Sequence, residues 1–137
     1  MPSLYSKTIN GVSGMIKADI EMKRDMDLVR AILLALEADT SGQGLKIEIP
    51  DYTQQQIDYH AELMAEAGLI EISVTETLKY KVIRVKRLTW AGHEFLDAAR
   101  QNHIWNLAKD SINKVGGATI QIWIGVLTAL IQKQLGL

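Results

Sequence analysis

The stretch from Tyr52 to Trp90 constrains the fold more than any other part of the sequence. It opens at Thr53, which has Gln56 three residues later, the pairing of a helix capping box. An apolar helical face follows and stops at Gly68, a residue suited to the left-handed conformation that ends a helix. Two strand-like runs come next, and Thr89 opens another helix. The predicted order is helix, β-hairpin, helix.

The hairpin is expected to use two runs of β-forming residues joined by a short turn. Residues 69–74 are predicted to form the first strand, residues 75–78 the turn, and residues 79–86 the second strand. The second run alternates poorly, because Val82 and Ile83 are adjacent apolar residues. A twisted hairpin with both faces partly buried is typical of such a run.

Amphipathic patterns on either side of this stretch predict further elements. Upstream, residues 25–38 place apolar side chains on one helical face and two aspartates in the first turn, where the helix dipole favours carboxylates. Residues 45–49 alternate apolar and charged side chains, which predicts a short half-buried strand that ends at Pro50. Downstream, helices are expected over residues 89–99, 103–115 and 119–135.

Together these elements predict a mainly helical α+β fold. Residues 22–87 have the outline of a winged-helix-like core, in the order helix, short strand, helix and β-hairpin wing. Residues 88–137 form a C-terminal helical extension. Residues 1–21 stand apart, because Gly11 and Gly14 weaken any helix there. They are expected to be either a loosely ordered leader or an arm that docks on the domain or on a second subunit.

Composition narrows the classes of function. The net charge is −1 at pH 7 and the pI is about 6.3, so the whole protein has no basic field to attract nucleic acid. The lack of cysteine excludes disulfides, thiolate nucleophiles and cysteine-based zinc sites, and it suits a cytoplasmic protein. The most apolar run, residues 118–131, is shorter than the roughly 20 residues that a membrane span needs. We therefore expect no membrane partner.

The sequence offers little for catalysis or metal binding. His60, His93 and His103 are its three histidines, and they lie on three different predicted helices without the spacing of a metal site. We expect His60 to be a hydrogen-bonded structural histidine, and His93 to pack or hydrogen-bond against the hairpin. Neither a Gly-rich phosphate loop nor a nucleophile with a nearby base can be recognised. We therefore expect no enzyme activity, no cofactor and no metal.

The one charged feature is a basic strip on the predicted wing, which no acidic residue interrupts. Its basic residues are Lys79, Lys81, Arg84, Lys86 and Arg87. Such a strip can meet DNA phosphates, although lysines on an edge strand also serve to block edge pairing. On the preceding helix, Gln54, Gln55 and Tyr59 can contact bases or phosphates. Glu62 and Glu66, at the far end of that helix, would repel a DNA backbone.

Four segments together resemble a known protein family. They are MKRDMDLVRAILLALE from Met22, IDYHAELMAEAGLIE from Ile57, LTWAGHEFLDAAR from Leu88, and a tail that runs from W-x-x-A-K at Trp105 through GGATIQIWIGVL. They are similar to family 2513 of the domains of unknown function, found in bacteria and their phages. The resemblance implies a small winged-helix-like domain with trailing helices. It carries over no catalytic residue, and residues 1–21 depart from the family pattern.

Two functions from different classes follow as hypotheses. In the first, the protein is a non-enzymatic DNA-binding accessory or transcriptional regulator of phage or mobile-element origin, which binds double-stranded DNA through the wing and the helix that begins after Thr53. In the second, the same scaffold binds a protein partner without nucleic acid. We also expect a homodimer through the last helix, where Ile122, Gly125 and Val126 lie outside the main apolar face.

Overall fold

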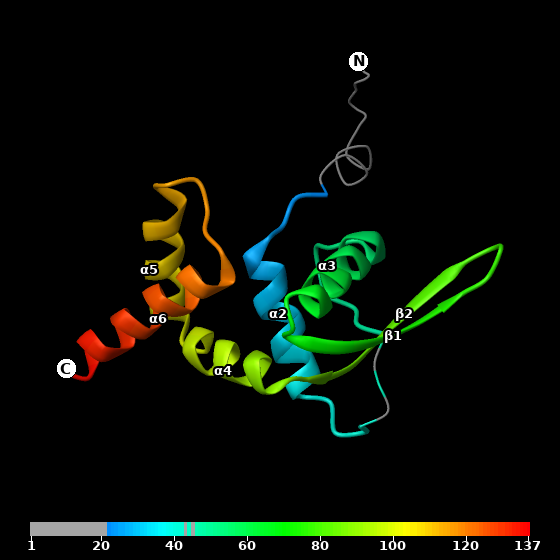
Figure 1. The fold of residues 1–137 in the computed structure, drawn as a ribbon, viewed down its shortest axis with the longest axis horizontal. Helices are drawn as coiled ribbons and strands as arrows, with labels where there is room; N and C mark the ends of the chain where they lie inside the picture. Colours follow the sequence, from blue (N-terminus) through cyan, green and yellow to red (C-terminus); the bar gives the residue numbers. More distant parts are fainter. Residues whose placement is uncertain (1–21, 43, 45) are drawn as a thin grey trace, which may run out of the picture.

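The computed structural model describes residues 22–42, 44 and 46–137, so the predicted leader or arm over residues 1–21 lies outside the described residues. Within them the protein is a mainly helical α+β fold, with five helices and one two-stranded antiparallel hairpin. Figure 1 shows the helices gathered in the body of the molecule and the hairpin projecting from it. The predicted fold class is confirmed at this level.

Helix α2 (Met26–Glu37) provides the centre of the core. Asp25 caps its first turn, because the carboxylate accepts hydrogen bonds from the backbone N–H groups of Asp27 and Leu28 at 2.9 and 3.3 Å. One face of the helix is buried, and it consists of Leu28, Val29, Ile32, Leu33 and Leu36. The predicted amphipathic helix is confirmed, and burial of this face holds it in place.

Helix α3 (Gln54–Glu66) begins and ends as its sequence predicts. The Thr53 hydroxyl accepts from the Gln56 N–H at 3.1 Å, and Gln56 Oε1 accepts from the Thr53 N–H at 2.9 Å. After the helix, Gly68 has a φ of 80°, a left-handed conformation that glycine adopts without Cβ strain. The capping box and the glycine stop are both confirmed.

Strands β1 (Ile70–Glu76) and β2 (Lys81–Leu88) form the hairpin that follows α3. A bulge at Glu71 and Ile72 leaves one extra residue in β2, which bends and twists the ladder there. The turn occupies residues 77–80, two residues later than expected, because the backbone N–H of Thr77 pairs with the carbonyl of Tyr80 at 2.8 Å. The predicted hairpin is confirmed, and both its turn and its second strand begin two residues later than predicted.

The predicted strand over residues 45–49 is wrong for the part that the structure describes. Residues 46–49 form no strand, and residue 45 lies outside the described residues. Ile47 is buried and Ile49 partly buried against the core, whereas the charged residues beside them are exposed. Core contacts therefore account for the alternation without a third strand, and the sheet has two strands.

Helix α4 (Trp90–Ala99) lies against the start of the hairpin. The hydroxyl of its N-cap Thr89 accepts from the Gly92 N–H at 3.0 Å, and the Thr89 N–H donates to the Leu69 carbonyl at 3.0 Å. A Cβ atom on Gly92 would stand 2.0 Å from that same Leu69 oxygen. Only glycine can be accommodated at this position. The contact between Gly92 and Leu69 therefore fixes the position of α4 relative to the start of the hairpin. The predicted cap at Thr89 is confirmed.

Helices α5 (Asn102–Asn113) and α6 (Ile120–Gln134) complete the body. Trp105 of α5 stacks on Trp123 of α6, with ring centroids 4.7 Å apart, and meets Phe95 of α4 edge-on at 6.3 Å. All three rings are at most 3 % exposed. Aromatic packing of this kind adds to the apolar area that the helices bury.

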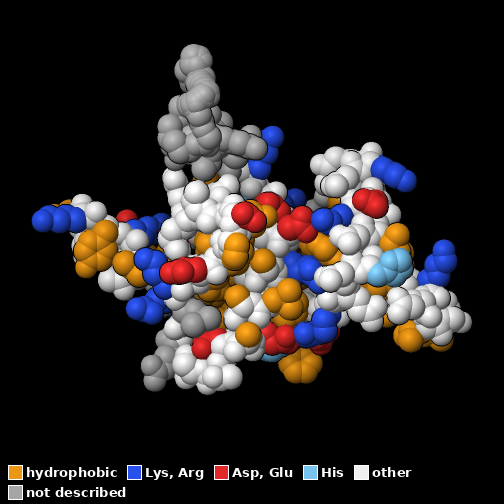
Figure 2. All heavy atoms as spheres, turned by 180° about the vertical axis from the view of Figure 1, so that it is seen from behind, with side chains coloured by type: hydrophobic (Ala, Val, Ile, Leu, Met, Phe, Trp, Pro, Cys, Tyr) orange, Lys and Arg blue, Asp and Glu red, His pale blue; other side chains and the backbone are white. Residues whose placement is uncertain are grey.

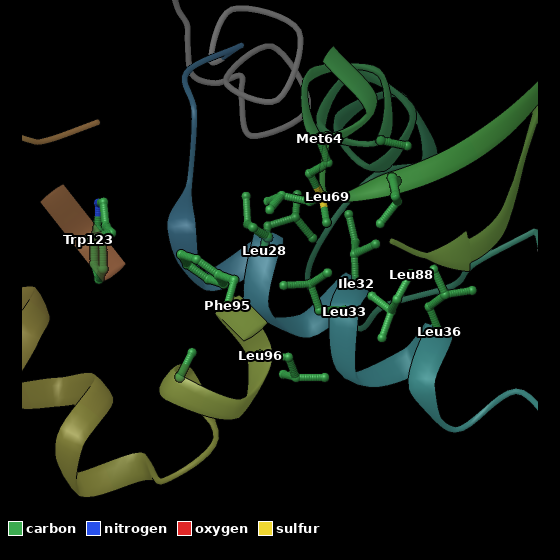
Figure 3. Packing of buried hydrophobic residues seen from close by; sticks show 14 of the residues in the cluster. Leu28, Ile32, Leu33, Leu36, Met64, Leu69, Leu88, Phe95, Leu96 and Trp123 are labelled. Carbon is green, nitrogen blue, oxygen red and sulfur yellow. The ribbon is translucent and has the colours of Figure 1, made fainter. Parts of the chain in front are cut away.

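The buried apolar residues form one cluster around α2. Figure 3 shows Leu28 and Ile32 of α2 among side chains that include Met64 of α3 and Phe95 of α4. Trp123 lies apart from these residues in the same view. Trp105, which contacts both Phe95 and Trp123, therefore connects α6 to the main core.

Candidate nucleic-acid interface

The three residues predicted to contact DNA from α3 lie in the first half of the helix. Gln55 is exposed, whereas Gln54 and Tyr59 are half-buried. The Gln54 amide donates to Asp58 Oδ1 at 2.8 Å, and the Tyr59 ring lies edge-on to His60 with centroids 5.8 Å apart. Two of the three side chains thus already contact neighbours on their own helix.

A shallow groove separates this part of α3 from β2. Its volume is about 420 Å³, and its lining residues are Met22, Gln54, Gln55, Asp58, Tyr59, Glu62, Lys81 and Ile83. Four of the predicted site residues meet there, because Lys81 reaches the groove from β2. The groove also contains the carboxylates of Asp58 and Glu62, which would repel a DNA phosphate.

Two of the five basic residues on the hairpin are neutralised by acids. Lys81 Nζ lies 3.0 Å from Glu62 Oε2, and this hydrogen bond raises the pKa of the Lys81 ammonium. Arg87 forms a bidentate pair with Glu71, at 2.6 and 3.0 Å. Both pairs are largely exposed and add little stability, but each offsets one positive charge on the surface.

The other three basic residues are Lys79, Arg84 and Lys86, called the free cations below. All three are exposed, and none of them makes an ion pair with any residue that the structure describes. Lys86 is the extra residue at the β-bulge, since Arg87 pairs with Glu71 and Val85 with Ile72. The free cations are therefore available to an external anion.

The predicted basic strip is divided between two faces of the hairpin. Lys81 faces α3, where it bonds to Glu62. Because side chains alternate along a strand, Arg84 points to the opposite face, and the register places Arg87 there as well. This outer face of the hairpin comprises Glu71, Ser73, Thr75, Val82, Arg84 and Arg87. Figure 2 shows basic and hydrophobic side chains over the hairpin, which projects at the left.

His60 has the structural role that was predicted for it. It is 2 % exposed, its Nε2 accepts from the Asp25 N–H at 2.8 Å, and its Nδ1 lies 2.8 Å from the Gln56 carbonyl oxygen. A neutral ring with its proton on Nδ1 satisfies both contacts. The prediction of a hydrogen-bonded structural histidine is confirmed.

The predicted contact between His93 and the hairpin is wrong. Its side chain is exposed, and its imidazole makes no hydrogen bond within the described part of the chain. Gly92 is the residue that meets the hairpin, and the helical step of about 100° per residue turns His93 away. His103 is exposed as well. Among the described residues, no group of three His, Asp or Glu side chains is placed to hold a metal ion.

A polar cleft at the N-terminus of α2 is a feature that the sequence did not indicate. Its volume is about 560 Å³. Tyr52 donates to Asp25 Oδ2 at 2.9 Å, and burial together with this bond raises the pKa of Tyr52 to about 12. The Trp105 indole and the Lys109 ammonium donate to Asp27 at 2.7 and 3.1 Å. Both carboxylates already accept hydrogen bonds from these side chains, so they contribute to the packing of α2 rather than to a free acidic site.

Comparisons with known proteins support the family resemblance that the sequence motifs indicate. The family described as "Hypothetical protein (DUF2513)" matches residues 23–119. The chain belongs to this family. A relative from Haemophilus influenzae, named "Uncharacterized protein", is 38 % identical over 95 residues, which cover 66 % of this chain and 79 % of that protein. No solved structure matches the chain. The resemblance stated from the sequence is confirmed.

Helix α6 begins directly after the last residue of the DUF2513 match. Of the three residues predicted to form a dimer interface, Ile122 is 53 % exposed and Gly125 is exposed with nothing within 4 Å of an added Cβ. Val126 is partly buried against the core. Two of the three are thus accessible. None of the described helices is both long and apolar enough to cross a membrane.

Proposed function

We propose that this DUF2513 protein is a non-enzymatic DNA-binding protein of the winged-helix type, acting as an accessory factor or transcriptional regulator. The succession of α2, α3 and a projecting hairpin supports this proposal, since winged-helix proteins place a wing directly after a helix pair. The observation that carries it is the set of free cations on the hairpin, which no acid neutralises within the described residues.

In this proposal the free cations contact DNA phosphates. Such contacts supply most of the sequence-independent affinity of a DNA-binding protein. The net charge of the protein is −1, so the attraction is local to the hairpin and is screened within about 10 Å at moderate salt. Gln55 is the exposed amide of α3 and the best-placed group there to hydrogen-bond with a base edge.

The test is a titration of fluorescently labelled duplex DNA, followed by anisotropy over a range of salt concentrations. The double variant Arg84→Ala/Lys86→Ala should bind more weakly to every duplex, with a salt slope reduced by about one unit per lost phosphate contact. The matched control is Lys114→Ala/Lys133→Ala, which removes two exposed charges from the other end of the molecule. Failure of the parent protein to bind any DNA at low salt contradicts the proposal.

A protein-interaction module is the second candidate function. It is favoured by the mixed charge of the α3 groove and by large apolar side chains that the fold leaves exposed. Leu78, Tyr80 and Trp90 are 107, 59 and 80 % exposed. Exposed apolar groups near both signs of charge are typical of surfaces that bind proteins. This function predicts no salt-dependent DNA binding at all.

We further propose that α6 forms a homodimer through Ile122, Gly125 and Val126. Gly125 allows a second backbone to approach, and two-fold dimers are the commonest oligomers. Sedimentation equilibrium should show a dimer that Ile122→Asp dissociates, because the new carboxylate would be buried in the interface. The control Gln132→Asp adds the same charge at an exposed position of α6. A monomeric parent protein at micromolar concentration contradicts the dimer.

A further inference from the structure

The outer face of the hairpin has a property that phosphate binding does not use. Tyr80, the last residue of the turn, is 59 % exposed, and Val82, the second residue of β2, is only partly buried. Tyr80 directly precedes β2, and its carbonyl accepts from the Thr77 N–H, so the pairing continues one step beyond Glu76 and Lys81. Alternation carried back by that step puts Tyr80 on the same side of the hairpin as Val82 and Arg84. The outer face therefore presents an aromatic ring, an apolar side chain and a free cation in succession.

The turn that carries Tyr80 is held by its own hydrogen bonds. The Thr77 N–H donates to the Tyr80 carbonyl at 2.8 Å. The Thr77 hydroxyl oxygen accepts from the N–H groups of Lys79 and Tyr80, each at 3.2 Å. These bonds fix the backbone at the end of the hairpin. Tyr80 is thus presented to solvent from a preorganised position, which lowers the entropy lost when a ligand binds.

The two sides of the hairpin differ in what they can bind. On the side of α3, Lys81 is paired with Glu62, and Asp58 adds a second carboxylate to the groove. Phosphates are repelled there. On the outer face Arg84 has no ion-pair partner among the described residues. The ring of Tyr80, four residues earlier, can stack on the face of a base. Base faces are accessible in single strands but are covered by their neighbours in a duplex.

We propose that the outer face of the hairpin binds single-stranded DNA, with one base stacked on Tyr80 and the backbone contacting Arg84 and the neighbouring bulge residue Lys86. Four residues of strand at ~3.3 Å each separate Tyr80 from Arg84 by about 13 Å, enough to cover a few nucleotides. This inference rests on the proposed function, because the same free cations bind phosphate in both. It adds the ligand class and the side of the hairpin that is used.

The experiment compares a labelled oligothymidine with a duplex of equal length in one anisotropy titration at low salt. Oligothymidine should bind more tightly than the duplex. Tyr80→Ala should weaken its binding about tenfold, the size of one base–aromatic contact, and Tyr80→Phe should retain it. Tyr80→Leu keeps an apolar group without a π face and should behave like Tyr80→Ala. Trp90→Ala, which removes an exposed aromatic ring from α4, is the matched control.

Each outcome distinguishes this inference from the proposed function. Tighter binding of the duplex, or equal affinity of Tyr80→Ala and parent for oligothymidine, overturns the inference. If Arg84→Ala/Lys86→Ala still loses duplex affinity in that case, the proposed function stands alone. If the parent protein binds neither DNA, both fall. Circular dichroism of each variant establishes that it is folded, and retention of binding by Tyr80→Phe excludes a purely structural loss.

Discussion

Two groups of polar side chains in this molecule differ in whether other residues of the fold bind them. At the N-terminus of α2, Asp25, Asp27, Tyr52 and His60 all make hydrogen bonds to other elements or to helix N–H groups. On the hairpin, the free cations Lys79, Arg84 and Lys86 have no ion-pair partner among the described residues. The first group is explained by stability. No contact within the described residues gives the second group a role in stability, and we propose a binding role for it.

The difference follows from what burial costs. A polar group that leaves water must find a partner, so a partly buried network is complete or the fold is destabilised. An exposed cation keeps its hydration and costs nothing to leave unpaired. The stability of the fold therefore does not require cations at these exposed positions of the hairpin. Substitutions in the body should reduce stability, and substitutions on the outer face should reduce binding.

The largest expected loss of stability is at Gly92, where α4 meets the backbone just before β1. Gly92→Ala places a Cβ 2.0 Å from the Leu69 carbonyl oxygen, so α4 or the hairpin must move. We expect a loss of about 3 kcal/mol in the free energy of unfolding, measured by urea denaturation, since overpacking against backbone is poorly relieved. The control Ser111→Ala, at an exposed position of α5, should gain up to about 0.5 kcal/mol from helix propensity. Equal stabilities would contradict the close contact.

His60 and His93 provide the next comparison, between a buried and an exposed histidine. His60→Leu leaves the Asp25 N–H without its acceptor and should cost about 2 kcal/mol of unfolding free energy. His60→Gln, whose amide oxygen can replace Nε2, should recover part of that loss. His93→Leu should change stability by less than about 0.5 kcal/mol, because the side chain is exposed. A comparable loss in both leucine variants would show that burial does not decide the effect.

Local sequence signals predicted the ends of the elements well. The caps at Thr53 and Thr89 and the stop at Gly68 each depend on residues within one helical turn, so the sequence alone contains the whole interaction. The family resemblance rests on local motifs for the same reason. The alternation over residues 45–49 predicts a strand that residues 46–49 do not form, since a half-buried irregular segment and a half-buried strand have the same pattern.

Contacts between distant residues could not be predicted. Lys81 meets Glu62 across 19 positions, and only the packing of β2 on α3 brings them together. The bulge shifts the register by one residue, so the sequence could not tell which basic residues share a face. Five basic residues in one strip therefore became two ion pairs and three free cations. Burial of His60 was predictable because its position on α3 follows helical periodicity.

Asp27 supplies a smaller, pH-dependent test of the network at α2. Burial raises the pKa of its carboxyl, but the hydrogen bonds from Trp105 and Lys109 outweigh burial and leave the pKa below its ordinary value of 3.8. A lowered folded pKa adds stability above the unfolded value, and this stability is lost as the pH falls through the folded pKa. Asp27→Asn should therefore be less stable than the parent at neutral pH and similar to it in strong acid. The side chain is half exposed, so we expect under about 1 kcal/mol, measured by urea denaturation against pH. A gap that does not change with pH contradicts the assignment.

The smallest expected change in stability belongs to the free cations of β2. Arg84→Ala/Lys86→Ala should unfold within about 0.5 kcal/mol of the parent, because neither side chain has an ion-pair partner in the described residues. Removing two of several neighbouring positive charges also relieves repulsion along β2, so a slight gain is compatible with the argument. The measurement is urea denaturation of the same preparations used for DNA titration. A loss above about 1 kcal/mol would mean that the fold uses these cations, and their exposure would no longer be a reason to assign them a ligand. Unchanged stability with reduced DNA affinity is the combination that separates a binding surface from a structural one.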